Sequence, residues 1–102
     1  MPTSGDRTNR MRIYMDEVVN SICLHLADRR QVAPTDIEVQ LAWDEEYGYT
    51  AEVWVQGRSQ YLVEANILEA IEQYMFRQYG RRVFRSDITL GLDDEIWADI
   101  RE

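Results

Sequence analysis

Residues 36–43 read DIEVQLAW, and polar and large apolar side chains alternate through the stretch, with the small Ala42 between Leu41 and Trp43. Because successive side chains of a β-strand point to opposite faces, the pattern puts Ile37, Val39 and Leu41 on one face. One apolar and one polar face predict a strand that is buried on a single side. The stretch therefore favours a sheet with one covered face and one open face.

A hairpin continues from this strand. The turn residues 44–48, DEEYG, are followed by a second alternating segment at residues 49–55. The pair Gln56-Gly57 is typical of a tight hairpin turn, which predicts a returning strand over residues 58–63. Three consecutive strands joined by short turns indicate an antiparallel sheet.

A helix is predicted on each side of these three strands. Upstream, an apolar stripe with helical spacing runs from Asp16 onward, and the helix should end before Pro34. Downstream, a second stripe runs through residues 67–75, and Gly80 occupies the position of a helix-ending glycine. The short segment 12–15 before the first helix fits either a strand or an early helical turn.

The second half of the chain repeats the layout of the first. Alternation over residues 88–92 and 96–100 predicts two strands around an acidic turn at residues 93–95. The chain therefore consists of two βαββ-like halves. They could come from an internal duplication, or they could be alike only because any two amphipathic helix–hairpin units align this well. We expect one α+β domain over residues 11–102, with a mostly antiparallel sheet and two helices on one face, after a flexible leader at residues 1–10.

The composition excludes several classes of function. With 19 acidic and 11 basic residues the chain carries a net charge of −8, which argues against a nucleic-acid partner because phosphate binding needs clustered positive charge. The single cysteine excludes an internal disulfide framework and a multi-cysteine zinc site. No apolar run reaches the ~18 residues that a membrane span needs. The first residues also lack the apolar stretch of a signal peptide, so we expect no membrane association and a cytoplasmic location.

The predicted sheet face that points away from the helices is unusual. It carries Trp54 and Trp97 among small residues, although a fully solvated sheet face seldom holds large apolar side chains. Tryptophan is enriched at protein interfaces, so this face predicts a homodimer contact. Local cover of the sheet by the two rings, or packing of the leader on them, explains the pattern equally well. The predicted contact residues are Trp54, Trp97, Ala42, Thr50 and Glu52.

The two acidic turns are candidate sites for Ca²⁺ or Mg²⁺, because both cations prefer oxygen ligands. Their spacing is not that of an EF-hand, and hairpin turns are often acidic merely because they are solvated. Two residues at the start of the second helix could complete a small-ligand site. The candidate set is Asp44, Glu45, Glu46, Asp93, Asp94, Glu95, Glu64 and Asn66.

Four arginines gather around the end of the second predicted helix, namely Arg77, Arg81, Arg82 and Arg85. Cations at this position complement the helix dipole. The same cluster could bind an anion, or it could meet the acidic turns of a partner chain. No glycine-rich phosphate loop accompanies the cluster, so the sequence favours no particular anion.

The sequence offers no catalytic constellation. Cys23 and His25 stand two positions apart on a helix, so their side chains point in different directions and cannot form a local pair. Cys23 lies in the apolar stripe, as expected of a small core residue. A zinc site at His25 would need carboxylate partners only. We therefore expect no metal, no cofactor and no enzyme activity.

Three segments resemble a family of small bacterial proteins. The segments VVNSICL at residues 18–24, WDEEYGYTAEV at residues 43–53 and EANILEAI at residues 64–71 are similar to the YxcD-like proteins, whose function is unknown. The resemblance covers about residues 11–95. It implies a stand-alone bacterial cytoplasmic protein with no assigned activity and carries over no catalytic residue. Together with the tryptophan face it favours a non-enzymatic interaction module that forms a homodimer; the alternative is a protein that binds a small ligand or divalent cation.

Overall fold

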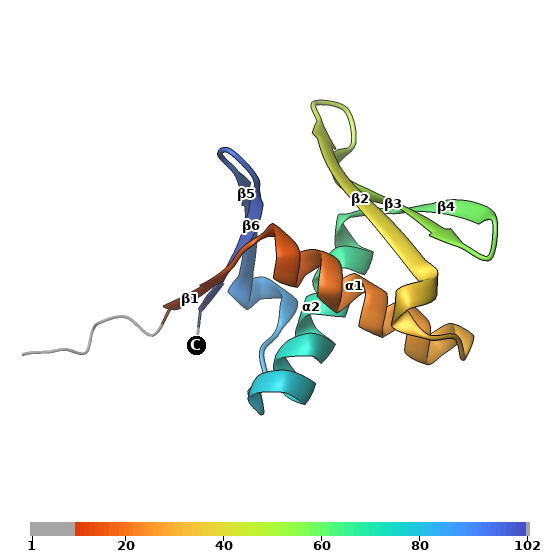
Figure 1. Cartoon of the computed structure of the whole chain (residues 1–102). Helices are drawn as coiled ribbons and strands as arrows, with labels where there is room; N and C mark the ends of the chain where they lie inside the picture. Colours follow the sequence, from red (N-terminus) through yellow and green to blue (C-terminus); the bar gives the residue numbers. More distant parts are fainter. Residues whose placement is uncertain (1–9, 102) are drawn as a thin grey trace, which may run out of the picture.

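The computed structural model describes residues 10–101, and almost all of them lie in regular elements (Figure 1). In chain order these are β1 (Arg10–Ile13), α1 (Met15–Arg30), the 3₁₀ turn η2 (Pro34–Asp36), β2 (Ile37–Asp44), β3 (Gly48–Val55), β4 (Arg58–Leu62), α2 (Glu64–Tyr79), the 3₁₀ turn η3 (Arg85–Asp87), β5 (Ile88–Leu92) and β6 (Ile96–Arg101). The predicted leader lies outside the described residues, except for Arg10, which begins β1.

The α+β class and the antiparallel pairing are confirmed, but the single sheet is wrong. The strands form two three-stranded sheets, one with the order β2-β3-β4 and one with the order β1-β6-β5. Alternation along a strand determines which of its faces is buried and says nothing about which strands are neighbours. Each predicted hairpin formed as expected, and the third strand of the second sheet is β1. The segment 12–15 is divided: residues 12 and 13 belong to this strand, and Met15 begins α1.

Both helices pack against the β2-β3-β4 sheet. Helix α1 packs against β2 and β6 and so touches both sheets, whereas α2 packs against β3 and β4. In Figure 1 the helix pair lies in the middle, with the β2-β3-β4 sheet above it to the right and the β1-β6-β5 sheet to its left. The apolar stripes of the helices and the inner faces of the sheets form one core. Its fully buried side chains include Ile13, Ile22, Val53, Met75 and Ile100.

Both helices begin with a side chain that accepts a hydrogen bond from the backbone. The Met15 N–H donates to Glu95 Oε1 (3.0 Å), a carboxylate from the β5–β6 turn. The Val63 N–H donates to Asn66 Oδ1 (3.2 Å), within the first turn of α2. Helix α2 ends at Gly80, whose φ of 68° is left-handed, as predicted for a helix-ending glycine.

Candidate functional site

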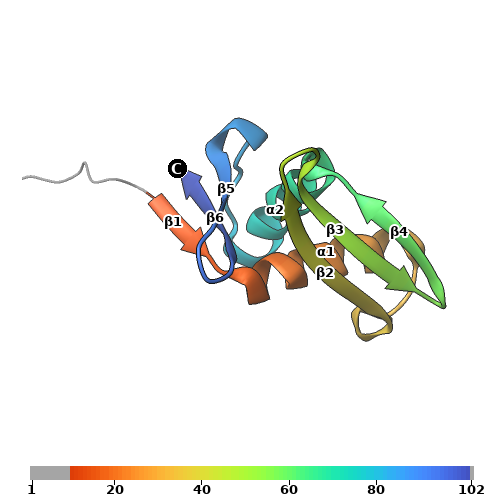
Figure 2. The same cartoon turned by 90° about the horizontal axis from the view of Figure 1, so that it is seen from above.

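Among residues 10–101, nothing covers the outer face of the β2-β3-β4 sheet. Figure 2 looks onto this face and shows the helices behind it. Cross-strand pairing places Trp54 in a row between Glu38 and Ser59. The next row contains Glu52 and Tyr61, whose side chain is 69% exposed. We call this surface the Trp54 face; its residues are Glu38, Gln40, Ala42, Thr50, Glu52, Trp54, Ser59 and Tyr61.

Four of the five predicted contact residues, Ala42, Thr50, Glu52 and Trp54, lie together on the Trp54 face. Tyr61 was missed, because the sequence pattern of its short strand shows no clear alternation. The negative charge of Glu52 and a hydrogen bond to its carboxylate raise the pKa of the Tyr61 hydroxyl. The two residues are cross-strand partners, so their side chains are neighbours on this face.

Trp97 does not share this face, so the expectation of one surface with both tryptophans is wrong. Trp97 lies in β6 of the other sheet, paired with Gly91. A Cβ atom at Gly91 would be only 2.1 Å from the Trp97 ring, so the ring lies directly on the Gly91 backbone. The Trp97 Nε1–H donates to Asp93 Oδ2 (3.0 Å), and the guanidinium of Arg12 lies 3.8 Å from the ring centroid. The ring thus covers its own sheet.

The acidic turns perform structural tasks. Asp44 Oδ1 accepts hydrogen bonds from the N–H groups of Glu46 (2.9 Å) and Tyr47 (2.7 Å), which shapes the β2–β3 turn. In the β5–β6 turn, Asp93 binds the indole of Trp97 and Glu95 binds the first turn of α1. These contacts explain several acidic residues without a bound cation.

Two of the predicted ligand residues from different segments do approach a common neighbour. Burial, followed by the charges of Glu64 and Asp93, raises the pKa of the Tyr49 hydroxyl. Even so, within residues 10–101 the His, Cys, Asp and Glu side chains form no group of three or more that could hold a metal ion. Cation binding by the turns stays a prediction, and no geometry described here favours it.

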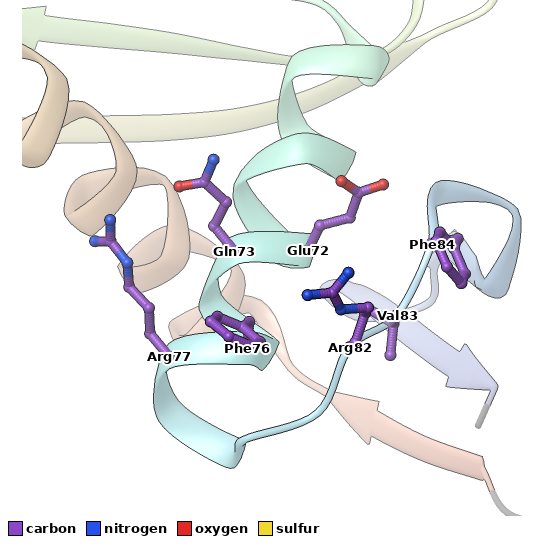
Figure 3. A pocket seen from close by; sticks show the side chains of 7 residues that line it. All are labelled: Glu72, Gln73, Phe76, Arg77, Arg82, Val83 and Phe84. Carbon is purple, nitrogen blue, oxygen red and sulfur yellow. The ribbon is translucent and has the colours of Figure 1, made fainter.

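The arginine cluster borders an open groove of about 460 Å³ between the second half of α2 and the connector that follows it (Figure 3). Phe76 (56% exposed) and Phe84 (63% exposed) are large apolar side chains in contact with solvent at this groove. The groove is lined by Glu72, Gln73, Phe76, Arg77, Arg82, Val83 and Phe84. Phe76 was missed as a surface residue; the signal was an aromatic side chain outside the apolar stripe of α2.

The arginines of the cluster have different environments. Arg77 pairs with Asp28 of α1 (3.0 Å), and Arg85 pairs with Glu72 at a longer distance (3.6 Å). The guanidinium of Arg82 lies 5.8 Å from the centroid of the Phe76 ring. Figure 3 shows it directed across the groove, between Phe76 and Glu72. Arg82 is thus presented beside an aromatic wall.

Two tyrosines of α2 share one carboxylate oxygen of α1. The hydroxyls of Tyr74 (2.7 Å) and Tyr79 (2.6 Å) both donate to Glu17 Oε2, and their rings meet edge to face with centroids 5.9 Å apart. Burial, reinforced by the hydrogen bond to Glu17, raises the pKa of Tyr74 to about 12. Tyr74 therefore stays protonated at neutral pH, and its hydroxyl joins α2 to α1.

The sequence candidates on α1 are parts of the core. The Cys23 thiol donates to the Ile37 carbonyl (3.7 Å), and burial raises the pKa of this thiol. His25 is only 6% exposed; its Nε2 is 3.5 Å from a guanidinium nitrogen of Arg29. The His25 Nδ1 has no hydrogen-bond partner among the described residues.

Fold and surface together define an α+β domain with one uncovered aromatic sheet face and one arginine-lined groove. The chain matches the model of a family described as Protein of unknown function (DUF2653) over residues 8–95, and it belongs to this family. No curated protein and no solved structure matches the chain. The finer YxcD-like resemblance has no named relative to support it and stays a prediction. In the described part of the chain, no helix is long and apolar enough to cross a membrane.

Proposed function

We propose that this protein is a non-enzymatic interaction module that forms a homodimer through its Trp54 face. The observation that carries the proposal is an uncovered sheet face on which Trp54 and Tyr61 occupy neighbouring rows. Tryptophan and tyrosine supply large contact area at little cost in side-chain entropy, and both are enriched at interfaces. An open antiparallel sheet can pack face to face on a second copy of itself.

The charges of this face predict a dimer of modest affinity. Glu38 and Glu52 lie on it, and its rows contain no basic residue. A two-fold contact would bring these carboxylates near those of the second copy, and like charges oppose association. The area around Trp54 must outweigh this repulsion, so self-association in the micromolar range is the expected outcome.

The ionisable side chains with resolved shifts support a role without catalysis. Cys23 and Tyr74 both have raised pKa values, so each stays protonated at neutral pH and is a poor nucleophile or base there. In accordance with the YxcD-like resemblance, we place the protein in the bacterial cytoplasm. A second, unidentified protein is the alternative partner for the same face.

Sedimentation of the full chain between 1 and 200 µM in 0.5 M salt, which screens contacts between exposed charges, tests the dimer. We expect the wild-type mass to rise from monomer to dimer across this range, and Trp54→Glu to stay monomeric and folded. Trp43→Glu is the matched control, because it makes the same change on the opposite face of the same sheet, at an exposed position. Trp97 is left unchanged because its ring supports its own sheet. A monomeric wild-type chain, or a dimeric Trp54→Glu chain, contradicts the proposal.

A further inference from the structure

The groove beside α2 is lined by two arginines, Arg77 and Arg82, and by one carboxylate, Glu72. Four of the 11 basic residues stand between positions 77 and 85, whereas the chain as a whole carries a charge of −8. Among the described residues no carboxylate pairs with Arg82, whose guanidinium contacts the Phe76 ring. Phe76 and Phe84 add exposed apolar area on either side of it. The matching occupant is an acidic segment that carries an aromatic anchor.

The tip of the β2–β3 hairpin has this chemistry. It presents Glu45, Glu46 and Tyr47, and the Tyr47 side chain is 67% exposed. The two hydrogen bonds that Asp44 accepts hold the tip in one shape, so little conformational entropy is lost when it binds. No described residue forms a hydrogen bond or ion pair with the carboxylates of Glu45 and Glu46. Two carboxylates and one ring are therefore available together.

The tip cannot reach the groove of its own chain. Figure 1 shows the β2–β3 turn at the top of the molecule and the end of α2 at the bottom, on the other side of the helix pair. Contact between them requires two molecules. The groove volume of about 460 Å³ is within the ~300–1,000 Å³ of ordinary binding pockets, which is room for a side chain such as that of Tyr47.

We infer that the β2–β3 tip of one copy docks into the α2 groove of a second copy. Tyr47 packs between Phe76 and Phe84, and a carboxylate of the tip pairs with Arg82. The inference deepens the proposed self-association and rests on it, but it uses different residues from those of the Trp54 face. Its two sides are different surfaces, so the contact is heterologous and can add copies beyond a two-fold dimer.

The test uses the full-length Trp54→Glu chain, in which the sheet-face contact is removed. At low ionic strength we expect its mass to rise with concentration, and we expect 0.5 M salt, an amount chosen to screen exposed charges, to reverse the rise. Adding Arg82→Glu should weaken this association about tenfold or more, because a carboxylate would then face a carboxylate. Where Trp54→Glu fails to fold, Tyr61→Glu provides the same background at a highly exposed position.

The decisive experiment exchanges the charges of the β2–β3 tip and the groove. Adding Glu45→Arg and Glu46→Arg to the Arg82→Glu chain exchanges the charges of tip and groove, and association should return. Arg58→Glu makes the same charge change at an exposed arginine of β4 and should leave association unchanged. Association that survives Arg82→Glu, or that the exchange fails to restore, overturns the docking. If Trp54→Glu abolishes the wild-type dimer and no association remains, the docking is refuted. The proposed dimer through the Trp54 face is then still supported.

Discussion

The guanidinium of Arg12 in β1 lies 3.8 Å from the ring centroid of Trp97 in β6, although the two residues are far apart in the sequence. The same guanidinium donates from Nε and Nη2 to the two carboxylate oxygens of Asp99 (2.7 and 3.1 Å). This hydrogen bonding raises the pKa of Arg12 above its ordinary value. Beneath the ring lies Gly91, so arginine, indole and bare backbone form three layers on the outer face of this sheet.

The first prediction concerns Gly91. A methyl group there would overlap the Trp97 ring, which must move away from Arg12 and Asp93. We expect Gly91→Ala to lower the free energy of unfolding by about 1–3 kcal/mol, as is usual for overpacking. Denaturant unfolding measures the change. In a Trp97→Ala background the same substitution should cost much less, and equal costs in the two backgrounds would refute the layered arrangement.

The second prediction concerns the tyrosine pair at the helix interface. The pKa of Tyr74 is raised from 10 to about 12 in the folded chain. A raised pKa stabilises the fold fully below pH 10, and this contribution of up to about 2 kcal/mol is lost as the pH rises toward 12. Stability should therefore fall over this window, and Tyr74→Phe should make the fall shallower. Equilibrium unfolding at several pH values gives the result; identical slopes for the two chains would contradict it.

The third prediction concerns His25. It is buried, and its Nδ1 has no hydrogen-bond partner among the described residues, so the fold bears the cost of one unsatisfied polar atom. We expect His25→Leu to leave the melting temperature unchanged or to raise it. His25→Gln, which keeps buried polar atoms at this position, is the control and should lower it. A large loss of stability in His25→Leu would instead indicate that the imidazole has a partner that matters.

The local elements follow from the sequence because they depend on neighbours a few positions apart. The alternation at residues 36–43 predicts β2, and the stripe that ends at Gly80 predicts α2, each to within a few residues. Asp44 and Asn66 illustrate a limit: both were identified as notable polar residues, but their roles are backbone hydrogen bonds at a turn and at a helix start. Residue type alone does not separate such contacts from ligand binding.

The rest depends on contacts between distant residues, which periodicity does not encode. Nothing in the alternation of β6 indicates that β1 pairs with it, so the division into two sheets was not foreseen. The environment of Trp97 was mispredicted for the same reason, because Arg12 covers its ring only when β1 pairs with β6. Trp54 was predicted correctly to lie on an open face, because the pairing of β2 with β3 in its own hairpin determines which face it occupies.

The pairing of β1 with β6 also has a consequence for the order of folding. Arg12 and Asp99 are separated by 87 positions, so this sheet cannot be completed until almost the whole described chain has left the ribosome. The β2-β3-β4 sheet needs only its own hairpins and can form earlier. During synthesis β1 therefore has no partner strand until β6 has been made.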